Sequence, residues 1–281
     1  MSMPTIRLAL ADIDSTLIPY GQAMASPASI AGVRAANRSG ILAGPITGRT
    51  TGRMRKMFGD ASDCWDTGVL VNGQVVRLRG QTILREVPSR HALEEVARIV
   101  RGFAGEGCAL TVYDDEVDGH DVCVGITREE MLRYPKAFAQ FCHCAPHVPD
   151  GVFLKTNVHL SLEREDAVRL RDELQRRVPE LTFVFPFPTS PTIDITPAGV
   201  TKLTGLRLLV DELEIRWDEV CVFGDGENDL PVIQAVPNSV AVSNADPKVI
   251  RAARWHIGAD VDDAVAGALQ ALASGEWPFS G

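Results

Sequence analysis

The sequence has no uninterrupted apolar run that approaches the ~18 residues a membrane-spanning helix needs. Its N-terminus also lacks a charged segment followed by an apolar segment, because Asp12 interrupts the only candidate for a secretory signal. Clustered cysteines are missing too, since the six cysteines are scattered through the chain. This scatter predicts reduced thiols instead of a disulfide framework. These absences together predict a cytoplasmic protein without a membrane partner.

A zinc site is the alternative use of the cysteines. Cys142, Cys144 and His147 lie close together in the sequence and could act as three ligands. Their Cys-x-Cys spacing lacks the usual two intervening residues, and no second ligand pair follows. Because a structural zinc site needs a complete tetrahedral set, we expect these side chains to pack without a metal.

Basic residues are outnumbered in this chain. The 28 Lys and Arg residues against 37 Asp and Glu residues give a formal net charge of −9. An acidic surface repels nucleic acid, so nucleic acid is not expected as the main partner. The same field would repel a phosphorylated metabolite unless a cation or a local basic cluster reversed it. The length of 281 residues predicts one large or two modest domains.

Strand and helix patterns alternate over residues 1–77 and again over residues 191–281. Such alternation predicts a parallel sheet covered on both faces, which is an α/β, doubly wound, Rossmann-like core. Pro45 cannot donate to a strand ladder and is expected at an edge or irregular position, and Asn72-Gly73 predicts a hairpin turn. Strand patterns cover residues 6–12, 41–47, 68–76, 219–225 and 239–245, and helical patterns cover residues 27–40, 203–213, 230–236, 246–255 and 260–273.

Residues 78–190 have a different texture, in which hairpin-like strands are mixed with helices. A turn is expected at Asp118-Gly119, and Thr127 and Glu130 are spaced as a capping box. The pattern predicts an α/β unit of residues 78–190 inserted into a core domain formed by 1–77 and 191–281. Strand patterns cover residues 108–115, 120–126 and 153–162, and helical patterns cover residues 89–103, 127–131 and 167–178.

Paired acidic residues follow the first predicted strand. Asp12 and Asp14 are two residues apart, so on a strand they would point the same way. The second strand ends in Thr47-Gly48-Arg49, and a later strand ends in the sequence GDGEND, residues 224–229. Because ligands of doubly wound sheets bind beyond the carboxyl ends of the strands, these three segments are expected to meet at one site.

Each of these residues also has an interpretation without a site. Asp14 could make local turn hydrogen bonds, Thr47 could cap a helix, and Arg49 could be a solvated charge. Asp225 and Asp229 could end a strand and cap the helix that follows.

The residues taken together favour a metal site. Two unit charges ~4 Å apart repel by roughly 4 kcal/mol at an effective dielectric constant of about 20, so converging carboxylates need a counter-ion. Hard oxygen ligands select Mg²⁺, which keeps waters for a substrate phosphate. Lys202, which lies near a helix N-terminus where a cation is disfavoured, would join Arg49 and Thr47 as a donor.

The motifs DIDST, TGR, GVT before Lys202, and GDGEND, in this order, resemble the four motifs of the haloacid dehalogenase superfamily. The inserted segment follows the third strand and is similar in position to the large α/β cap of the Cof-type branch. The similarity extends over nearly the whole chain and is weakest in the cap. It continues at Val71–Gly73, Ile193–Lys202 and Val240–Ala253.

The resemblance implies a magnesium-dependent phosphatase that hydrolyses a small phosphate monoester through an aspartyl-phosphate. Asp12 would be the nucleophile, and Asp14 would protonate the leaving oxygen and then activate the hydrolytic water. The metal would be bound by the side chains of Asp12 and Asp225 and by the backbone carbonyl of Asp14. Asn228 and Asp229 would organise these ligands.

The resemblance also implies which residues bind the phosphoryl group. Thr47, the Gly48 amide and Lys202 would bind its oxygens and stabilise their charge in the transition state. Arg49 would contact the substrate or the cap, and Asn228 would contribute to phosphate binding. Asn244 is placed at the edge of the site.

One position departs from the family pattern. The superfamily usually has glycine where this chain has Ser15. If the backbone there needs a positive φ, serine costs of order 1–2 kcal/mol of strain. We interpret the serine as tolerated, although it is the best reason to expect lowered activity.

Other functions fit the sequence less well. A dinucleotide-binding loop after residues 219–223 fails at the third glycine, where Asp229 stands. A non-catalytic sugar-phosphate-binding protein is expected to have lost the nucleophile or the acid, yet both are present. A phosphomutase of the same superfamily shares the covalent step and stays an alternative, whereas halide-removing relatives need no metal.

The substrate is not specified by the motifs. We expect a small phosphorylated metabolite, for example a sugar phosphate, that the cap selects. Candidate cap residues are His120, Lys155, Asn157 and His159, each of which is equally compatible with a structural role.

Overall fold

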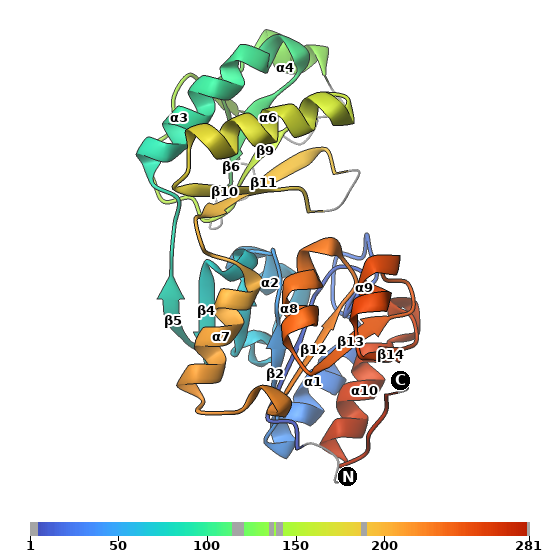
Figure 1. Ribbon diagram of the computed structural model, residues 1–281. Coiled ribbons are helices and arrows are strands. Elements are labelled where there is room, and N and C mark those ends of the chain that lie inside the picture. Colours follow the sequence, from blue (N-terminus) through green and yellow to red (C-terminus); the bar gives the residue numbers. More distant parts are fainter. Residues whose placement is uncertain (1–4, 114–120, 135–137, 139–142, 187–189, 280–281) are drawn as a thin grey trace. The chain divides into compact units, whose positions relative to one another are not determined.

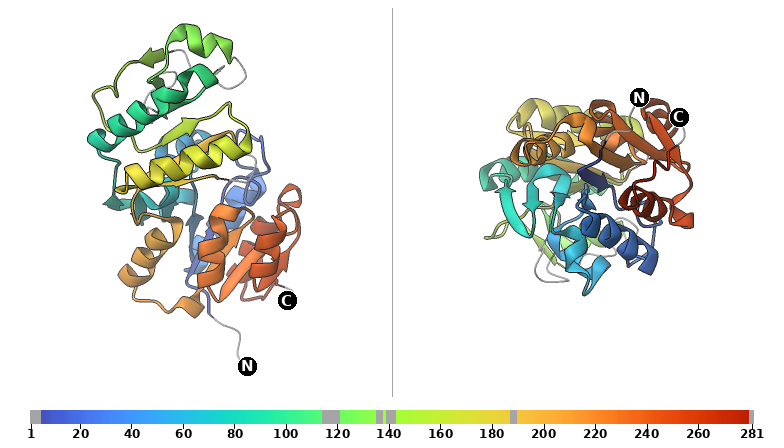
Figure 2. Two further views of the ribbon diagram at one scale, coloured as in Figure 1. Left: turned by 45° about the horizontal axis from the view of Figure 1, so that its top comes forward. Right: turned by 90° about the horizontal axis from the view of Figure 1, so that it is seen from below.

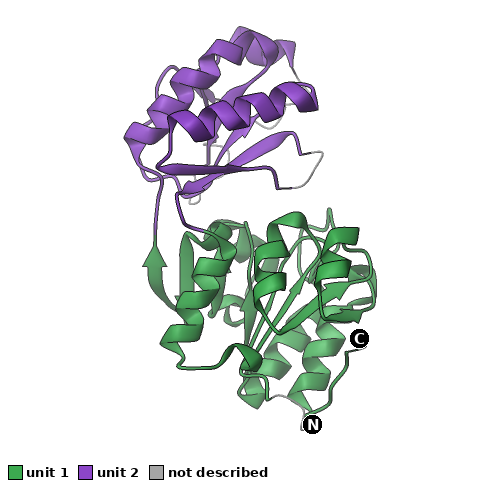
Figure 3. Ribbon diagram, viewed as in Figure 1, with its two compact units in different colours: residues 1–85, 201–281 green, residues 86–200 purple. Residues whose placement is uncertain are grey.

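The computed structural model describes most of the chain, and the segments it describes form two compact units (Figures 1 and 3). We call residues 1–85 with 201–281 the core unit, and residues 86–200 the cap unit. The described residues are 5–113, 121–134, 138, 143–186 and 190–279. The predicted turn at Asp118-Gly119 and the residues His120 and Cys142 lie outside them.

The units divide at different residues from those expected from the sequence. β5 (Gln81–Arg85) pairs with β4 (Val75–Leu78) and therefore stays in the core unit. β11 (Thr192–Pro197) pairs with β9 (Thr156–His159) in the sheet of the cap unit. Strand pairing, which a composition change does not reveal, sets both boundaries.

A five-stranded parallel sheet in the order β14-β13-β12-β1-β2 is the centre of the core unit. Every residue of the three inner strands is buried, as expected for a parallel sheet with both faces covered. Pro45 ends the edge strand, where its missing N–H is harmless, as predicted. The strands are β1 (Leu8–Ala11), β2 (Leu42–Pro45), β12 (Val220–Gly224), β13 (Asn238–Val242) and β14 (Trp255–Ile257).

Helices cover both faces of this sheet, which confirms the doubly wound α/β fold (Figure 2). One group is α1 (Pro27–Ser39) with α10 (Ala264–Ala273), and the other is α7 (Lys202–Glu212), α8 (Leu230–Ala235) and α9 (Pro247–Ala252). α1 begins after the N-cap Ser26 and ends at Gly40, whose φ is 95°. α1 and α10 approach so closely that a β-carbon at Gly32 would lie 2.7 Å from the carbonyl oxygen of Ala266.

A small antiparallel sheet of β3 (Gly68–Leu70), β4 and β5 completes the core unit, together with α2 (Thr51–Phe58). The predicted hairpin is present, with the turn Val71–Gly73 between β3 and β4. Val71, Asn72 and Gly73 all have positive φ, at 50°, 54° and 103°. A positive φ is unusual for a β-branched residue such as valine.

This turn holds two other segments in place. The Val71 amide donates to the Arg49 carbonyl at 3.1 Å, and the Asn72 amide donates to the Thr47 carbonyl at 3.0 Å. On its other side, a β-carbon at Gly73 would lie 2.1 Å from the carbonyl oxygen of Thr201, the N-cap of α7. The turn therefore lies between the Thr47–Arg49 loop and the start of α7.

The cap unit is built on a six-stranded sheet in the order β10-β11-β9-β6-β7-β8. α3 (Arg90–Val100) and α6 (Arg164–Arg177) pack with the sheet around an apolar core that includes Val96, Val158 and Leu170. The capping box of Thr127 and Glu130 is present at the start of α4 (Arg128–Arg133), as predicted. The remaining strands are β6 (Ala109–Val112), β7 (Val122–Val124), β8 (His143–Ala145) and β10 (Leu181–Val184). No helix in the described segments is long and apolar enough to cross a membrane.

Replacing Gly73 by alanine is expected to lower the free energy of unfolding by more than about 2 kcal/mol. A left-handed backbone costs a residue with a β-carbon about 1–2 kcal/mol, and here the new atom would also collide with Thr201. Gly40→Ala is the matched control, because Gly40 has a φ of 95° and no atom within 4 Å of its β-carbon position. Urea unfolding of both variants measures the difference. Equal losses would show that the contact with Thr201 is unimportant.

Candidate functional site

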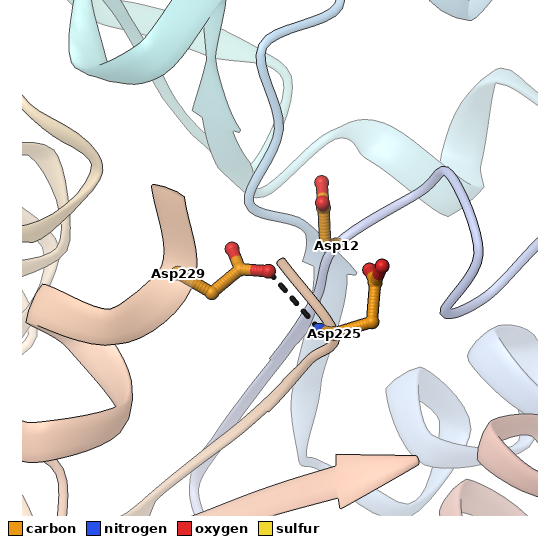
Figure 4. A group of neighbouring side chains, drawn as sticks. All are labelled: Asp12, Asp225 and Asp229. Carbon is orange, nitrogen blue, oxygen red and sulfur yellow. Dashed lines mark hydrogen bonds between the residues drawn. The ribbon is translucent and has the colours of Figure 1, made fainter. Parts of the chain in front are cut away.

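Three carboxylates from two strand ends lie together in the core unit (Figure 4). Asp12 follows β1, Asp225 follows the neighbouring strand β12, and Asp229 ends the short 3-10 helix Glu227–Asp229. One oxygen from each carboxylate lies within 4.8 Å of the others. The structure thus brings together Asp12 and Asp225, which are far apart in the sequence, and a divalent ion fits the donor set of hard oxygens.

The ammonium group of Lys202 lies among these carboxylates. Its Nζ atom is 2.7 Å from Oδ1 of Asp229 and 3.1 Å from Oδ1 of Asp12. Lys202 is 3% exposed, although it is the first residue of α7, where the helix dipole disfavours a cation. The two acidic partners compensate for this placement. When all four groups are ionised, the ammonium group neutralises one of the three carboxylates. The two remaining negative charges can be neutralised by a divalent cation.

Asp229 and Asp225 use their oxygens differently. Oδ2 of Asp229 accepts from the backbone amide of Asp225 at 3.2 Å (Figure 4). The same oxygen accepts from the Gly226 amide at 3.1 Å, and Oδ1 accepts from Lys202. Oδ1 of Asp225 accepts from the Thr16 hydroxyl at 2.7 Å. Within the described segments, Oδ2 of Asp225 accepts no hydrogen bond. The geometry therefore suits Asp225 as a ligand and Asp229 as a residue that orients its neighbours.

Asp14 lies apart from this cluster in its contacts. Its carboxylate receives two hydrogen bonds from Arg49, from Nε at 2.7 Å and from Nη2 at 2.6 Å. Both side chains are about one-third exposed, at 34% for Asp14 and 38% for Arg49. The hydrogen bond to Asp14 raises the pKa of Arg49. The resemblance implied that Arg49 contacts the substrate or the cap, and it did not predict this ion pair.

The Thr47–Arg49 loop is held in place by hydrogen bonds of its backbone groups. Thr47 is 1% exposed, and its amide donates to the Val69 carbonyl at 2.8 Å. Its hydroxyl accepts from the Arg49 amide at 3.2 Å. A β-carbon at Gly48 would lie 3.0 Å from Oδ1 of Asn72, so the Asn72 side chain lies directly against this glycine.

The superfamily motif usually has glycine at the position of Ser15, where a positive φ was considered. Ser15 has a positive φ of 56°. The turn is closed by hydrogen bonds from the Ser15 amide to the Ile18 carbonyl at 2.9 Å and from the Leu17 amide to the Asp12 carbonyl at 3.1 Å. The Ser15 carbonyl accepts from Nδ2 of Asn244 at 2.8 Å. The turn that follows the proposed nucleophile is therefore strained and held from a separate loop.

Burial sets the protonation behaviour of the cluster. Burial and the neighbouring carboxylates outweigh the attraction of Lys202 and raise the pKa of Asp12 to about 8. Burial likewise raises the pKa of Asp225 to about 6, against the hydrogen bond from Thr16. For Lys202, burial acts to lower the pKa, but Asp12 and Asp229 outweigh it and raise the pKa above its ordinary value. The lysine therefore stays charged.

The remaining predicted residues lie elsewhere. Asn228 is half-buried in the Glu227–Asp229 helix. In the cap unit, Lys155 and Asn157 both contact Asp194, with Nζ of Lys155 at 2.8 Å, and His159 contacts the Tyr113 hydroxyl at 3.1 Å. Asp194 was not predicted as a site residue from the sequence. A charged residue between Ile193 and Ile195 of a buried strand was the available signal.

The parallel α/β core with an inserted mixed-sheet unit defines the class of protein, and a family comparison agrees with it. The family model for haloacid dehalogenase-like hydrolases matches residues 9–269, and the chain belongs to this family. The predictions of family, fold and enzyme class are confirmed.

Solved structures share this fold over almost the whole chain. A protein from Eubacterium rectale has a TM-score of 0.74 at 22% identity and covers 95% of this chain and 99% of its own. A HAD/COF-like hydrolase from Plasmodium vivax has a TM-score of 0.73 at 20% identity, covering 95% of both chains. A sugar phosphatase of HAD subclass IIB has a TM-score of 0.70 at 16% identity, covering 94% of this chain and 98% of its own. These likenesses confirm the Cof-type fold with an α/β cap.

Curated relatives match over shorter segments. The 5-amino-6-(5-phospho-D-ribitylamino)uracil phosphatase YbjI of Escherichia coli is 35% identical over 88 residues, which are 31% of this chain and 32% of that protein. A phosphoglycolate phosphatase of Methanothermobacter thermautotrophicus is 34% identical over 84 residues, 30% of this chain and 38% of that protein. The chain spans less than two thirds of the length of these curated relatives.

Ser15→Gly is expected to raise the free energy of unfolding by about 0.5–1 kcal/mol. Removing the left-handed strain gains about 1–2 kcal/mol, and the greater freedom of glycine in the unfolded chain offsets part of it. Gly21→Ser is the converse control, since Gly21 has a φ of 84° and no atom within 4 Å of its β-carbon position. Chemical denaturation should show opposite signs for the two variants. A destabilised Ser15→Gly protein would contradict strain at this turn.

The raised pKa of Asp12 predicts a pH-dependent stability of the metal-free protein. Asp12 binds a proton more tightly when folded, so its contribution is complete below about pH 4 and is lost as pH rises through about 8. In EDTA, the wild-type protein is therefore expected to lose up to about 1.4 kcal/mol per pH unit more than Asp12→Asn across this window. Denaturation curves from pH 4.5 to 8.5 measure it. Parallel pH profiles of the two proteins would refute the raised pKa.

Proposed function

We propose that this haloacid dehalogenase-like hydrolase is a magnesium-dependent phosphatase that hydrolyses a small phosphate monoester through an aspartyl-phosphate. The observation that carries the proposal is the buried contact of Lys202 with Asp12, beside the Asp225 carboxylate. An acidic protein with a net charge of −9 gains here a lysine and a cation-binding cluster, which together can attract a phosphoryl dianion. The small phosphorylated substrates named for YbjI and for the phosphoglycolate phosphatase support the substrate class.

The donor set fits Mg²⁺ and supports the following set of ligands. Asp12 and Asp225 would bind it through side chains, joined by the backbone carbonyl of Asp14. Both oxygens of Asp229 are occupied by Lys202 and by two backbone amides, so Asp229 and Asn228 would organise the ligands from outside. When bound, Mg²⁺ supplies positive charge that offsets the carboxylates and the phosphoryl oxygens.

The first chemical step forms the covalent intermediate. A carboxylate oxygen of Asp12 attacks phosphorus, and the bond from phosphorus to the leaving oxygen breaks. The leaving oxygen keeps the bonding electron pair and takes a proton from Asp14. Lys202, the Thr47 hydroxyl and the Gly48 amide stabilise the phosphoryl oxygens.

The second step regenerates the enzyme. Asp14, now ionised, takes a proton from a water molecule whose oxygen bonds to phosphorus. The bond between phosphorus and the Asp12 oxygen breaks, which releases inorganic phosphate and the Asp12 carboxylate. Arg49 pairs through two hydrogen bonds with the ionised form of Asp14 that this step requires, and its remaining donors can reach an anionic substrate.

Phosphate release from a panel of phosphorylated metabolites tests the proposal. The wild-type protein is expected to release phosphate with Mg²⁺ and to stop in EDTA, because its carboxylates then lack their counter-ion. Asp12→Asn is expected to lose more than about 10³-fold, since a covalent nucleophile has no substitute. Asp262→Asn, an exposed residue of the core unit, should match wild type.

The same panel separates the alternatives. Binding of a sugar phosphate without turnover would replace the proposal with a non-catalytic binding protein. Transfer of phosphate to a second sugar position would indicate a phosphomutase. Hydrolysis that survives Asp12→Asn would refute the assignment of the nucleophile.

A further inference from the structure

We propose that Thr16 and Asn244, neither of which is a metal ligand, position the Asp225 carboxylate for a divalent cation. The inference rests on the proposed function, because it concerns the cation that the phosphatase would use. The observations that support it differ from those that support the proposed function. They are hydrogen bonds between the loops that follow three adjacent strands of the core sheet.

Thr16 fixes the Asp225 side chain. Thr16 is 1% exposed, and its hydroxyl donates to Oδ1 of Asp225 at 2.7 Å, across 209 positions of sequence. A hydrogen bond from a buried hydroxyl to a carboxylate is short and directional. It therefore fixes the orientation of the Asp225 carboxylate, which has an oxygen within 4.8 Å of an oxygen of Asp12, where a cation would bind.

Asn244 fixes the turn that carries Thr16. Its Nδ2 atom donates to the Ser15 carbonyl at 2.8 Å, while its Oδ1 atom accepts from the Asp260 amide at 3.0 Å. The side chain is thus held at both ends and cannot rotate freely. Because Ser15 has an unfavourable φ of 56°, its conformation needs such external support.

The loop containing Asn244 also holds the backbone of Asp225. The Asp246 amide, two residues beyond Asn244, donates to the Asp225 carbonyl at 2.8 Å. A loop that follows β13 therefore contacts both the turn after β1 and the residue after β12. This loop contributes no carboxylate to the cluster of Asp12, Asp225 and Asp229. We therefore infer that it sets the spacing between Asp12 and Asp225.

Isothermal titration of the 281-residue protein with MgCl₂ tests the inference directly, without relying on turnover. Thr16→Val keeps the shape but removes the hydroxyl, and is expected to weaken Mg²⁺ binding about 10–100-fold. Thr16→Ser keeps the hydroxyl and is expected to stay within about threefold of wild type. Thr82→Val, at an exposed position of β5, is the control for the substitution itself.

Asn244→Ala provides a second variant at an exposed position, which protects the test if Thr16→Val folds poorly. It is expected to weaken Mg²⁺ binding in the same direction. Since Asn244 acts through the Ser15–Thr16 turn, the double variant should lose less than the product of the two single losses.

The outcomes distinguish this inference from the proposed function. Equal affinities for Thr16→Val and wild type, or equal losses for Thr16→Val and Thr16→Ser, would overturn the positioning role. Wild-type protein that binds Mg²⁺ but releases phosphate from no ester would overturn the proposed function and leave the positioning role standing. Wild-type protein that binds no Mg²⁺ at millimolar concentration would overturn both.

Discussion

The buried ammonium group of Lys202 is the interaction on which the site depends. It contacts Asp12 and Asp229, and without this ammonium group the two buried carboxylates would lie beside each other with no paired positive charge. Removing one member of such a group is strongly destabilising, because it leaves an unpaired buried charge. The parallel sheet provides the arrangement, since β1 and β12 are neighbours and both aspartates follow their carboxyl ends. The fold and the charge balance therefore constrain each other.

Three of the six non-glycine residues that have a positive φ in the described segments belong to the two turns that support the site. Ser15 follows the first acidic segment, and Val71 and Asn72 hold the Thr47–Arg49 loop, all three with φ between 50° and 56°. Non-glycine residues rarely take this conformation, and it persists only where the surroundings enforce it. Here hydrogen bonds from Asn244 and to Thr47 and Arg49 provide that enforcement. These positive φ values lower the local stability of the backbone, and they fix the positions of polar groups at the site.

The sequence predicted the elements that rest on periodicity and on the strand-end rule. The meeting of Asp12 with Asp225 followed from the alternation of strands and helices, and the confirmed family and fold followed from the order of the motifs. Side-chain pairing across the site was not predictable: Arg49 with Asp14, and Thr16 with Asp225, join loops whose conformations depend on positive φ. The strands β5, β8, β10, β11 and β14 and the helix α2 were missed. The unit boundaries depend on strand pairing.

The inserted unit returns to the core unit at Thr201, one residue before Lys202. Thr201 caps α7, and its carbonyl lies against Gly73. The backbone conformation at this junction is therefore closely restricted. The outgoing junction after Arg85 follows β5, which is an edge strand of the small antiparallel sheet. We therefore expect the two junctions between the units to differ in how much sequence change they accept. A chimaera that exchanges the insert between relatives can vary the outgoing crossing, but has to keep Thr201 and Gly73 as a matched pair.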